Sequence, residues 1–108
     1  MEGEHLVYDI ETDGLFHQVT TIWCIGIMPA GGGEVVTYTD RDPALPSLQE
    51  GLDRLKAAQK LIGHNVIGYD MPVLNKLRPD VALTFEQHWD TMVVAALVEP
   101  SRRSVALA

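Results

Sequence analysis

The sequence is poor in cysteine, in basic residues and in long apolar runs, and each shortage excludes a class of protein. Its one cysteine, Cys24, can form neither an internal disulfide nor a cysteine cage for a metal. No apolar stretch approaches the roughly 18 residues that cross a bilayer. The residues after Met1 lack the basic and apolar regions of a signal peptide. We therefore expect a cytoplasmic protein without a membrane partner.

The shortage of basic residues also limits the ways in which the chain can bind nucleic acid. The sequence has 8 Lys and Arg and 15 Asp and Glu, which gives a net charge of −7. This balance argues against a protein that binds DNA through broad contact with phosphates. Carboxylates that hold divalent cations are an exception, because the bound ions reverse the local field that a substrate meets.

The length of 108 residues predicts one domain over residues 1–108, with an irregular tail at 101–108. Expected strands cover residues 5–10, 19–28, 34–39, 61–65 and 85–89, and expected helices cover 47–60, 72–77 and 91–98. Ser47 and Glu50 fit a capping box, and the last helix is apolar all round, which predicts that it is buried. The order is typical of an α/β ribonuclease H-like domain, a mixed sheet with flanking helices, although other mixed folds share it.

Three acidic residues are placed where a metal site could form. Asp9 and Glu11 end the first expected strand and, two residues apart, point to one face. A bare D-x-E pair is more often a solvated strand face, and Asp70 alone is read as the N-cap of the helix after it. Together the three are hard oxygen ligands of the kind that Mg²⁺ and Mn²⁺ prefer. Two such ions ~3.5–4 Å apart are the usual apparatus for attack on a phosphodiester.

Two longer motifs contain these acids and carry a family resemblance. Residues 8–15, YDIETDGL, resemble the first motif of DEDD-type 3′-to-5′ exonucleases. HN at 64–65 together with YDMPVLNKL at 69–77 resembles the family's second motif. WDTM at 89–92 resembles the D-T that opens the family's next helix. The resemblance is strongest to the proofreading domain of family A DNA polymerases, especially the bacteriophage kind, and it spans about residues 6–98.

The resemblance implies roles for single residues. Asp9 would bridge two metal ions, Glu11 would bind the ion that holds the attacking water, and Asp70 would act on the second ion. His64 and Asp90 would be supporting residues, with a helix N-cap as an equal alternative for Asp90. Contacts to the terminal nucleotide of the substrate would come from Thr12, Leu15, Asn65 and Tyr69.

The sequence departs from the family after Asp70. The third motif of the family, a Tyr or His four residues before a metal-binding Asp, does not occur in residues 71–108, where His88 is followed at that spacing by Met92. Residues 104–108 resemble the start of the family's next helix. The resemblance therefore implies a domain truncated before its last motif, without the residue that orients the water and without one metal ligand.

These observations predict a 3′-to-5′ exonuclease that hydrolyses single-stranded DNA 3′ ends with two Mg²⁺ or Mn²⁺ ions. A second polypeptide, or a second copy in a homodimer, would complete the site. The alternative is a catalytically incomplete module that binds nucleic acid or a replication protein. If a phage encodes the chain, it would act in the host cytoplasm; whether the substrate is DNA or RNA stays open.

Overall fold

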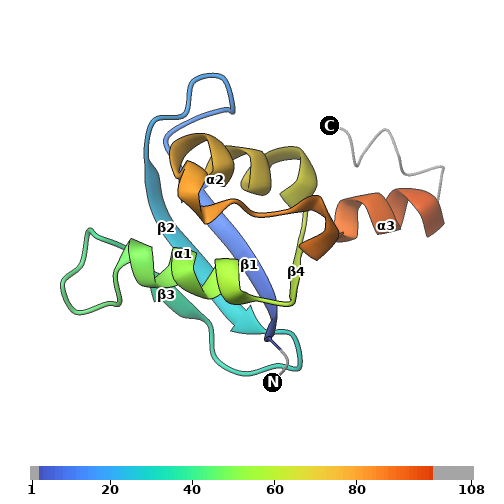
Figure 1. Cartoon of the computed structure of the whole chain (residues 1–108), viewed down its shortest axis with the longest axis horizontal. Coiled ribbons are helices and arrows are strands. Elements are labelled where there is room, and N and C mark those ends of the chain that lie inside the picture. The colour runs from blue at the N-terminus through green and yellow to red at the C-terminus, as the bar shows by residue number, and fades with distance from the viewer. Residues whose placement is uncertain (1–2, 99–108) are drawn as a thin grey trace.

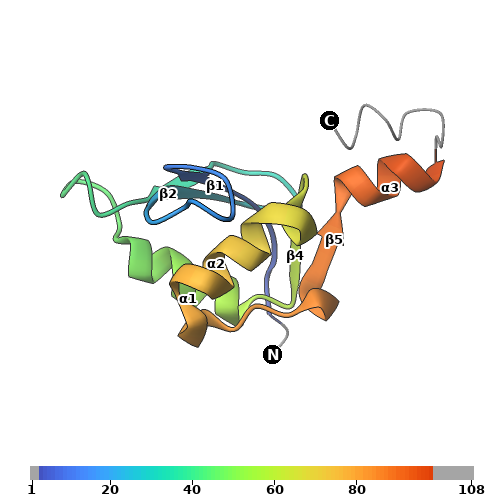
Figure 2. The same cartoon turned by 90° about the horizontal axis from the view of Figure 1, so that it is seen from above.

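The computed structural model describes residues 3–98, and these form a five-stranded sheet with two helices packed on one face (Figures 1 and 2). The strands are β1 (His5–Thr12), β2 (Ile22–Pro29), β3 (Val36–Tyr38), β4 (Lys60–Gly63) and β5 (His88–Asp90). The α-helices are α1 (Leu48–Ala57), α2 (Met71–Leu77) and α3 (Thr91–Val98), and the short helical turns are η1 (Val66–Asp70), η2 (Pro79–Val81) and η3 (Phe85–Gln87).

The strand order is β3-β2-β1-β4-β5, and the sheet is mixed. The pairs β1/β2 and β2/β3 are antiparallel, whereas β1/β4 and β4/β5 are parallel. The antiparallel half follows from short connections along the chain, and the parallel half needs the crossovers that α1 and α2 supply. The expected mixed α/β sheet with flanking helices is confirmed.

The core lies between the sheet and helices α1 and α2. In β1, Leu6, Tyr8 and Ile10 are buried, while Asp9 and Glu11, which alternate with them, are exposed. Figure 2 shows α1 and α2 together on one side of β1 and β2. The opposite face of these strands is left without a covering helix among the described residues, and there the acidic residues lie.

Helix α1 begins at the predicted capping box. The Ser47 Oγ accepts the Glu50 N–H at 3.2 Å, and the Glu50 carboxylate accepts the Ser47 N–H at 2.7 Å. Two of the N–H groups at the start of the helix are thereby satisfied. The apolar stripe of the helix, which includes Leu52 and Leu55, is buried against the sheet.

Replacing Ser47 by alanine is expected to lower the free energy of unfolding by about 1 kcal/mol, because alanine cannot accept the Glu50 N–H. Ser47→Asp, which keeps an acceptor at the same position, is the matched control and should lose much less. Urea unfolding followed by circular dichroism measures both. Equal losses in the two variants would show that the side-chain acceptor contributes nothing.

Two strands are shorter than their sequence pattern predicts. The second begins at Ile22 and not at residue 19, because 13–21 form a loop in which the Asp13 carboxylate accepts the N–H groups of Thr20 and Thr21. The third covers Val36–Tyr38 within the expected 34–39. The first helix likewise ends at Ala57, three residues before the expected end, since Lys60 already belongs to β4.

The C-terminal elements differ more. The strand expected at 85–89 is a helical turn capped by Thr84, followed by β5, His88–Asp90. The helix expected to be buried, α3, exposes Val93, Leu97 and Val98, because it extends beyond the sheet edge at β5 (Figures 1 and 2). The tail expected at 101–108 lies outside the described residues. No helix within 3–98 is long and apolar enough to cross a membrane.

Candidate active site

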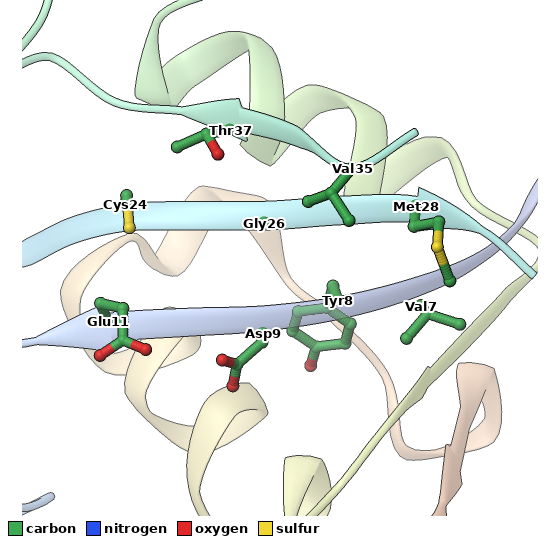
Figure 3. Close-up of a pocket in the computed structure, with 9 residues that line it drawn as sticks. All are labelled: Val7, Tyr8, Asp9, Glu11, Cys24, Gly26, Met28, Val35 and Thr37. Atoms are coloured by element: carbon green, nitrogen blue, oxygen red, sulfur yellow. The ribbon is translucent and has the colours of Figure 1, made fainter. Parts of the chain in front are cut away.

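The two carboxylates of β1 lie on the sheet face that α1 and α2 leave open. Asp9 and Glu11 are both exposed, and Figure 3 shows them along one strand. Each faces a residue of β2 in the antiparallel register, Asp9 opposite Gly26 and Glu11 opposite Cys24. A hollow of about 300 Å³ lies beside them, and Thr37 of β3 closes its far side.

Gly26 keeps space open beside Asp9. The nearest atoms to a Cβ placed on Gly26 would be Val35 Cγ1 at 3.6 Å and the Asp9 carbonyl oxygen at 4.0 Å. Directly opposed residues on neighbouring antiparallel strands normally have side chains in contact. Because Gly26 has no side chain, the space next to Asp9 on the β2 side stays open and forms part of the hollow.

Asp70 approaches β1 from the open edge of that strand. Strands β1 and β4 pair through His5, Leu6 and Val7, so the backbone of β1 beyond this point is left to η1. The Asp70 Oδ2 accepts the Ile10 N–H at 3.1 Å, and Asp70 is 4% exposed. Asp70 occupies the N-cap position of α2, as its position before the helix predicts, but its side chain makes no capping hydrogen bond there.

The environment of Asp70 opposes its ionisation. Burial raises the pKa of Asp70 to about 7; the Ile10 N–H lowers it, and the negative charge of Asp9, and more weakly that of Asp90, raises it further. The negative charge of Asp9 thus adds a repulsion to the burial that disfavours the ionised form of Asp70. A bound cation would offset this repulsion and favour the ionised form of Asp70.

Asp90 fixes the turn that leads into Asp70. It is 4% exposed, and its Oδ1 accepts the N–H groups of Asn65 at 2.8 Å and Met92 at 2.9 Å. Its Oδ2 accepts the Ile67 N–H at 2.9 Å. Asp90 therefore caps the N-terminus of α3, and the same carboxylate anchors the turn in which Asn65 adopts φ 58°.

Two of the residues expected to contact the substrate, Thr12 and Tyr69, contact the loop at 13–21, and Leu15 lies in it. The Tyr69 hydroxyl lies 2.5 Å from both the Gly14 carbonyl oxygen and the Thr12 Oγ1, so these two side chains hold the loop. Leu15 in that loop is 72% exposed. His64 and Asn65 are exposed, and the His64 Nδ1 lies 3.0 Å from the Thr91 Oγ1.

A divalent cation needs several oxygen ligands close together. Within residues 3–98, no three His, Cys, Asp or Glu side chains converge closely enough to hold a metal ion by themselves. The donor set has the right chemistry, since Asp9, Glu11 and Asp70 offer carboxylate oxygens, which hard cations prefer. The ion pair found in this part of the chain, Arg54 with Glu4, leaves Asp9 and Glu11 without a cationic partner.

The profile of the RNase H superfamily matches residues 6–107. The chain belongs to the RNase H superfamily. Among solved structures, this RNase H-superfamily chain is similar to a family B DNA polymerase from the hyperthermophilic archaeon Pyrobaculum calidifontis, with 18% identity and a TM-score of 0.48. The match covers 81% of this chain and 12% of that polymerase. A search of curated proteins finds no relative.

Cys24 belongs to the site of this RNase H-superfamily chain although its apolar neighbours predict a buried core position. It is half-buried on the open face, opposite Glu11, and its thiol has a raised pKa because of burial and then because of the charges of Glu11 and Asp9. The regular register that opposes Cys24 to Glu11 places it on this face, and just beyond it a register shift leaves Trp23 as an extra residue in β2. A local apolar run carries no signal for such a bulge.

Proposed function

We propose that this chain is a 3′-to-5′ exonuclease module that hydrolyses DNA 3′ ends with Mg²⁺ or Mn²⁺. The observation that carries the proposal is the pair of exposed carboxylates, Asp9 and Glu11, which have no ion-pair partner within residues 3–98 and lie on the open face of an RNase H-superfamily sheet. Asp70 lies at the edge of β1, and the negative charge of Asp9 raises its pKa. Nucleases with this fold generally use divalent metals, and these are the donors that such ions prefer.

In this proposal Asp9 and Glu11 hold the cations and Asp70 assists from the edge of β1. When bound, the cations stabilise negative charge on the phosphate and lower the pKa of water. The residues of the chain orient the substrate. The bond from Ile10 N–H to Asp70 keeps that carboxylate in place, and exposed Leu15 offers an apolar surface to the terminal base.

We further propose that the module is of the proofreading type found in family A DNA polymerases of bacteriophage character. The order and spacing of the motifs at 8–15, 64–77 and 89–92 support this. Because three carboxylates do not enclose an ion within residues 3–98, the proposal includes a further ligand from another polypeptide or a second copy. Single-stranded 3′ ends are the proposed substrate.

A second candidate function is a module that binds single-stranded ends or a replication protein without cleaving them. The observation that favours it is the same incomplete ligand set in the described part of the chain. The two candidates differ in whether the strand is cleaved, since a binding module leaves the bound strand intact. Cleavage by purified protein therefore separates them.

Purified chain with Mn²⁺ is expected to shorten a 5′-labelled single-stranded oligonucleotide stepwise from its 3′ end. Asp9→Asn and Glu11→Gln should each slow this at least about tenfold, because each removes a charged oxygen ligand worth about 1.4 kcal/mol or more of transition-state stabilisation. Denaturing gels of the product ladder measure the rate. The loss should be the same in Mg²⁺ and Mn²⁺.

Asp53→Asn is the matched control, because Asp53 is an exposed carboxylate of α1 that accepts a hydrogen bond from Gln49 at 2.9 Å. It should cleave as the wild type does. If wild type and Asp9→Asn produce the same ladder, the exonuclease proposal is wrong. Binding of the intact strand by all three proteins would then favour the binding module.

A further inference from the structure

Most of the cations in residues 3–98 of this acidic chain donate hydrogen bonds within the protein. Six Lys and Arg lie in the described residues, and four of them donate to protein acceptors. Arg54 binds the Glu4 carboxylate, and the lysines at 56, 60 and 76 each donate to a backbone carbonyl. The other two, Arg41 and Arg78, form no ion pair or side-chain hydrogen bond with any residue of 3–98.

These two arginines line the same pocket. The pocket has a volume of about 280 Å³ and is formed by the start of β2, the loop before α1 and the end of α2. The Arg41 guanidinium lies 5.1 Å from the centroid of the Trp23 ring, which supports it. Asp40 also lines the pocket, but its carboxylate accepts the Leu48 N–H at 3.0 Å. The pocket is thus lined by two arginines and one aspartate.

The pocket lies at the same end of the sheet as the carboxylates of β1. Ile22, a lining residue, pairs directly with Thr12, the residue after Glu11. Trp23 is the extra residue of the bulge at this point, and a bulge turns a side chain away from its regular direction. The loop at 13–21, held by Tyr69, connects the two places.

We propose that Arg41 and Arg78 bind a backbone phosphate of the nucleic-acid strand whose 3′ end reaches Asp9 and Glu11. Guanidinium groups match the geometry of phosphate oxygens and pair with them through two parallel hydrogen bonds. A strand that approaches a protein of net charge −7 needs such local cations, and within residues 3–98 Arg41 and Arg78 are those whose side chains have no ion-pair or hydrogen-bond partner. The direction of the strand rests on the proposed exonuclease function, whereas the phosphate site rests on the arginines.

The test is the binding of a fluorescent single-stranded decanucleotide to the full chain in EDTA, followed by anisotropy. Arg41→Gln and Arg78→Gln are each expected to weaken binding about tenfold. Each should also reduce the slope of log affinity against log salt by about one phosphate contact. Lys56→Gln is the matched control, because Lys56 is an exposed cation that donates to the Asp80 carbonyl and does not line this pocket.

A local probe distinguishes the source of the phosphate. In a Trp89→Phe background, Trp23 is the remaining tryptophan, and its fluorescence reports occupation of the pocket. The decanucleotide is expected to saturate this signal at a concentration at least about tenfold below that needed for thymidine monophosphate or inorganic phosphate, since a strand makes further contacts. If inorganic phosphate saturates it as tightly as the decanucleotide, the pocket does not bind the strand and the proposal is overturned.

Failure of this proposal can be told from failure of the exonuclease proposal. Equal binding by the wild type, Arg41→Gln and Arg78→Gln would overturn the pocket assignment even if Asp9→Asn abolishes cleavage. Weakening by Lys56→Gln as strong as that by the pocket variants would also overturn it, because bulk charge would then explain the effect. Loss of binding in the two arginine variants, with no cleavage by any protein, would support the pocket and leave the exonuclease function refuted.

Discussion

The variant Asp70→Asn is expected to be more stable than the wild type at neutral pH, by up to about 4 kcal/mol in the free energy of unfolding. Burial, helped by the charge of Asp9, raises the pKa of Asp70 from its ordinary value of 3.8 to about 7. An asparagine keeps an acceptor for the Ile10 N–H and has no charge to bury. A residue that destabilises the fold at working pH is typical of a functional position.

The direction of the pH dependence follows from the two pKa values. Between pH 3.8 and about 7, Asp70 holds its proton in the folded chain and loses it in the unfolded chain. The folded state then binds more protons, so the free energy of unfolding falls as pH rises through this window, by about 1.4 kcal/mol per pH unit. His88 acts in the opposite direction, because burial lowers its pKa below 6.5.

The contribution of Asp70 is isolated by subtracting one protein from the other. Urea unfolding of wild type and Asp70→Asn in EDTA, at about pH 4.5 and about pH 7.5, cancels His88 and every other shared group. We expect the difference in unfolding free energy to be small at the lower pH and to grow by a few kcal/mol at the higher one. Asp53→Asn, an exposed position, should show no such growth. A difference that is the same at both pH values would refute the raised pKa.

The features that could be predicted from the sequence are those set by neighbouring residues. In β1, alternation alone separates Asp9 and Glu11 from the buried side chains on either side of them. The capping box of Ser47 and Glu50 likewise depends on a spacing of three residues. Because both patterns are local, their physical meaning does not change with the rest of the fold.

The roles of Asp70 and Asp90 could not be deduced in this way. Each precedes a helix, and a local pattern assigns such an aspartate to the helix N-terminus. The partner of Asp70 is the N–H of Ile10, 60 positions earlier, and those of Asp90 include the N–H of Asn65, 25 positions earlier. These distant partners meet only because the crossover places η1 at the free edge of β1, and a local pattern contains no information about that crossover.

The phosphate pocket was missed for a related reason. Its arginines lie 37 positions apart (78 − 41), one in the loop before α1 and the other after α2, and nothing in either neighbourhood indicates a pair. The bulge at Trp23 is equally hidden, because the run from Ile22 to Ile25 has the composition of an ordinary buried strand. The register of β1 and β2 alone reveals the extra residue.

Replacing Gly63 by alanine is expected to destabilise the fold by about 3 kcal/mol, because the added methyl group has no room. A Cβ at this position would overlap Val66 Cγ1 and lie 2.8 Å from the Tyr8 carbonyl oxygen. The first contact can relax by movement of a side chain, but the second is with the backbone of β1. Gly63 ends β4 where the chain turns toward Asn65, so the strain would act on the turn that places Asp70.

Two further variants make this expectation specific to the close approach of β4 and β1. Gly31→Ala, where a Cβ would meet no atom within 4 Å, should change the free energy of unfolding by less than about 0.5 kcal/mol. Adding Val66→Ala to Gly63→Ala should recover part of the loss by removing the side-chain overlap, although Val66→Ala alone leaves a cavity and is destabilising. The contact with the Tyr8 oxygen persists in the double variant, so full recovery is not expected. If Gly63→Ala and Gly31→Ala unfold at the same urea concentration, the close contact of Gly63 with Val66 and with the Tyr8 carbonyl oxygen is refuted.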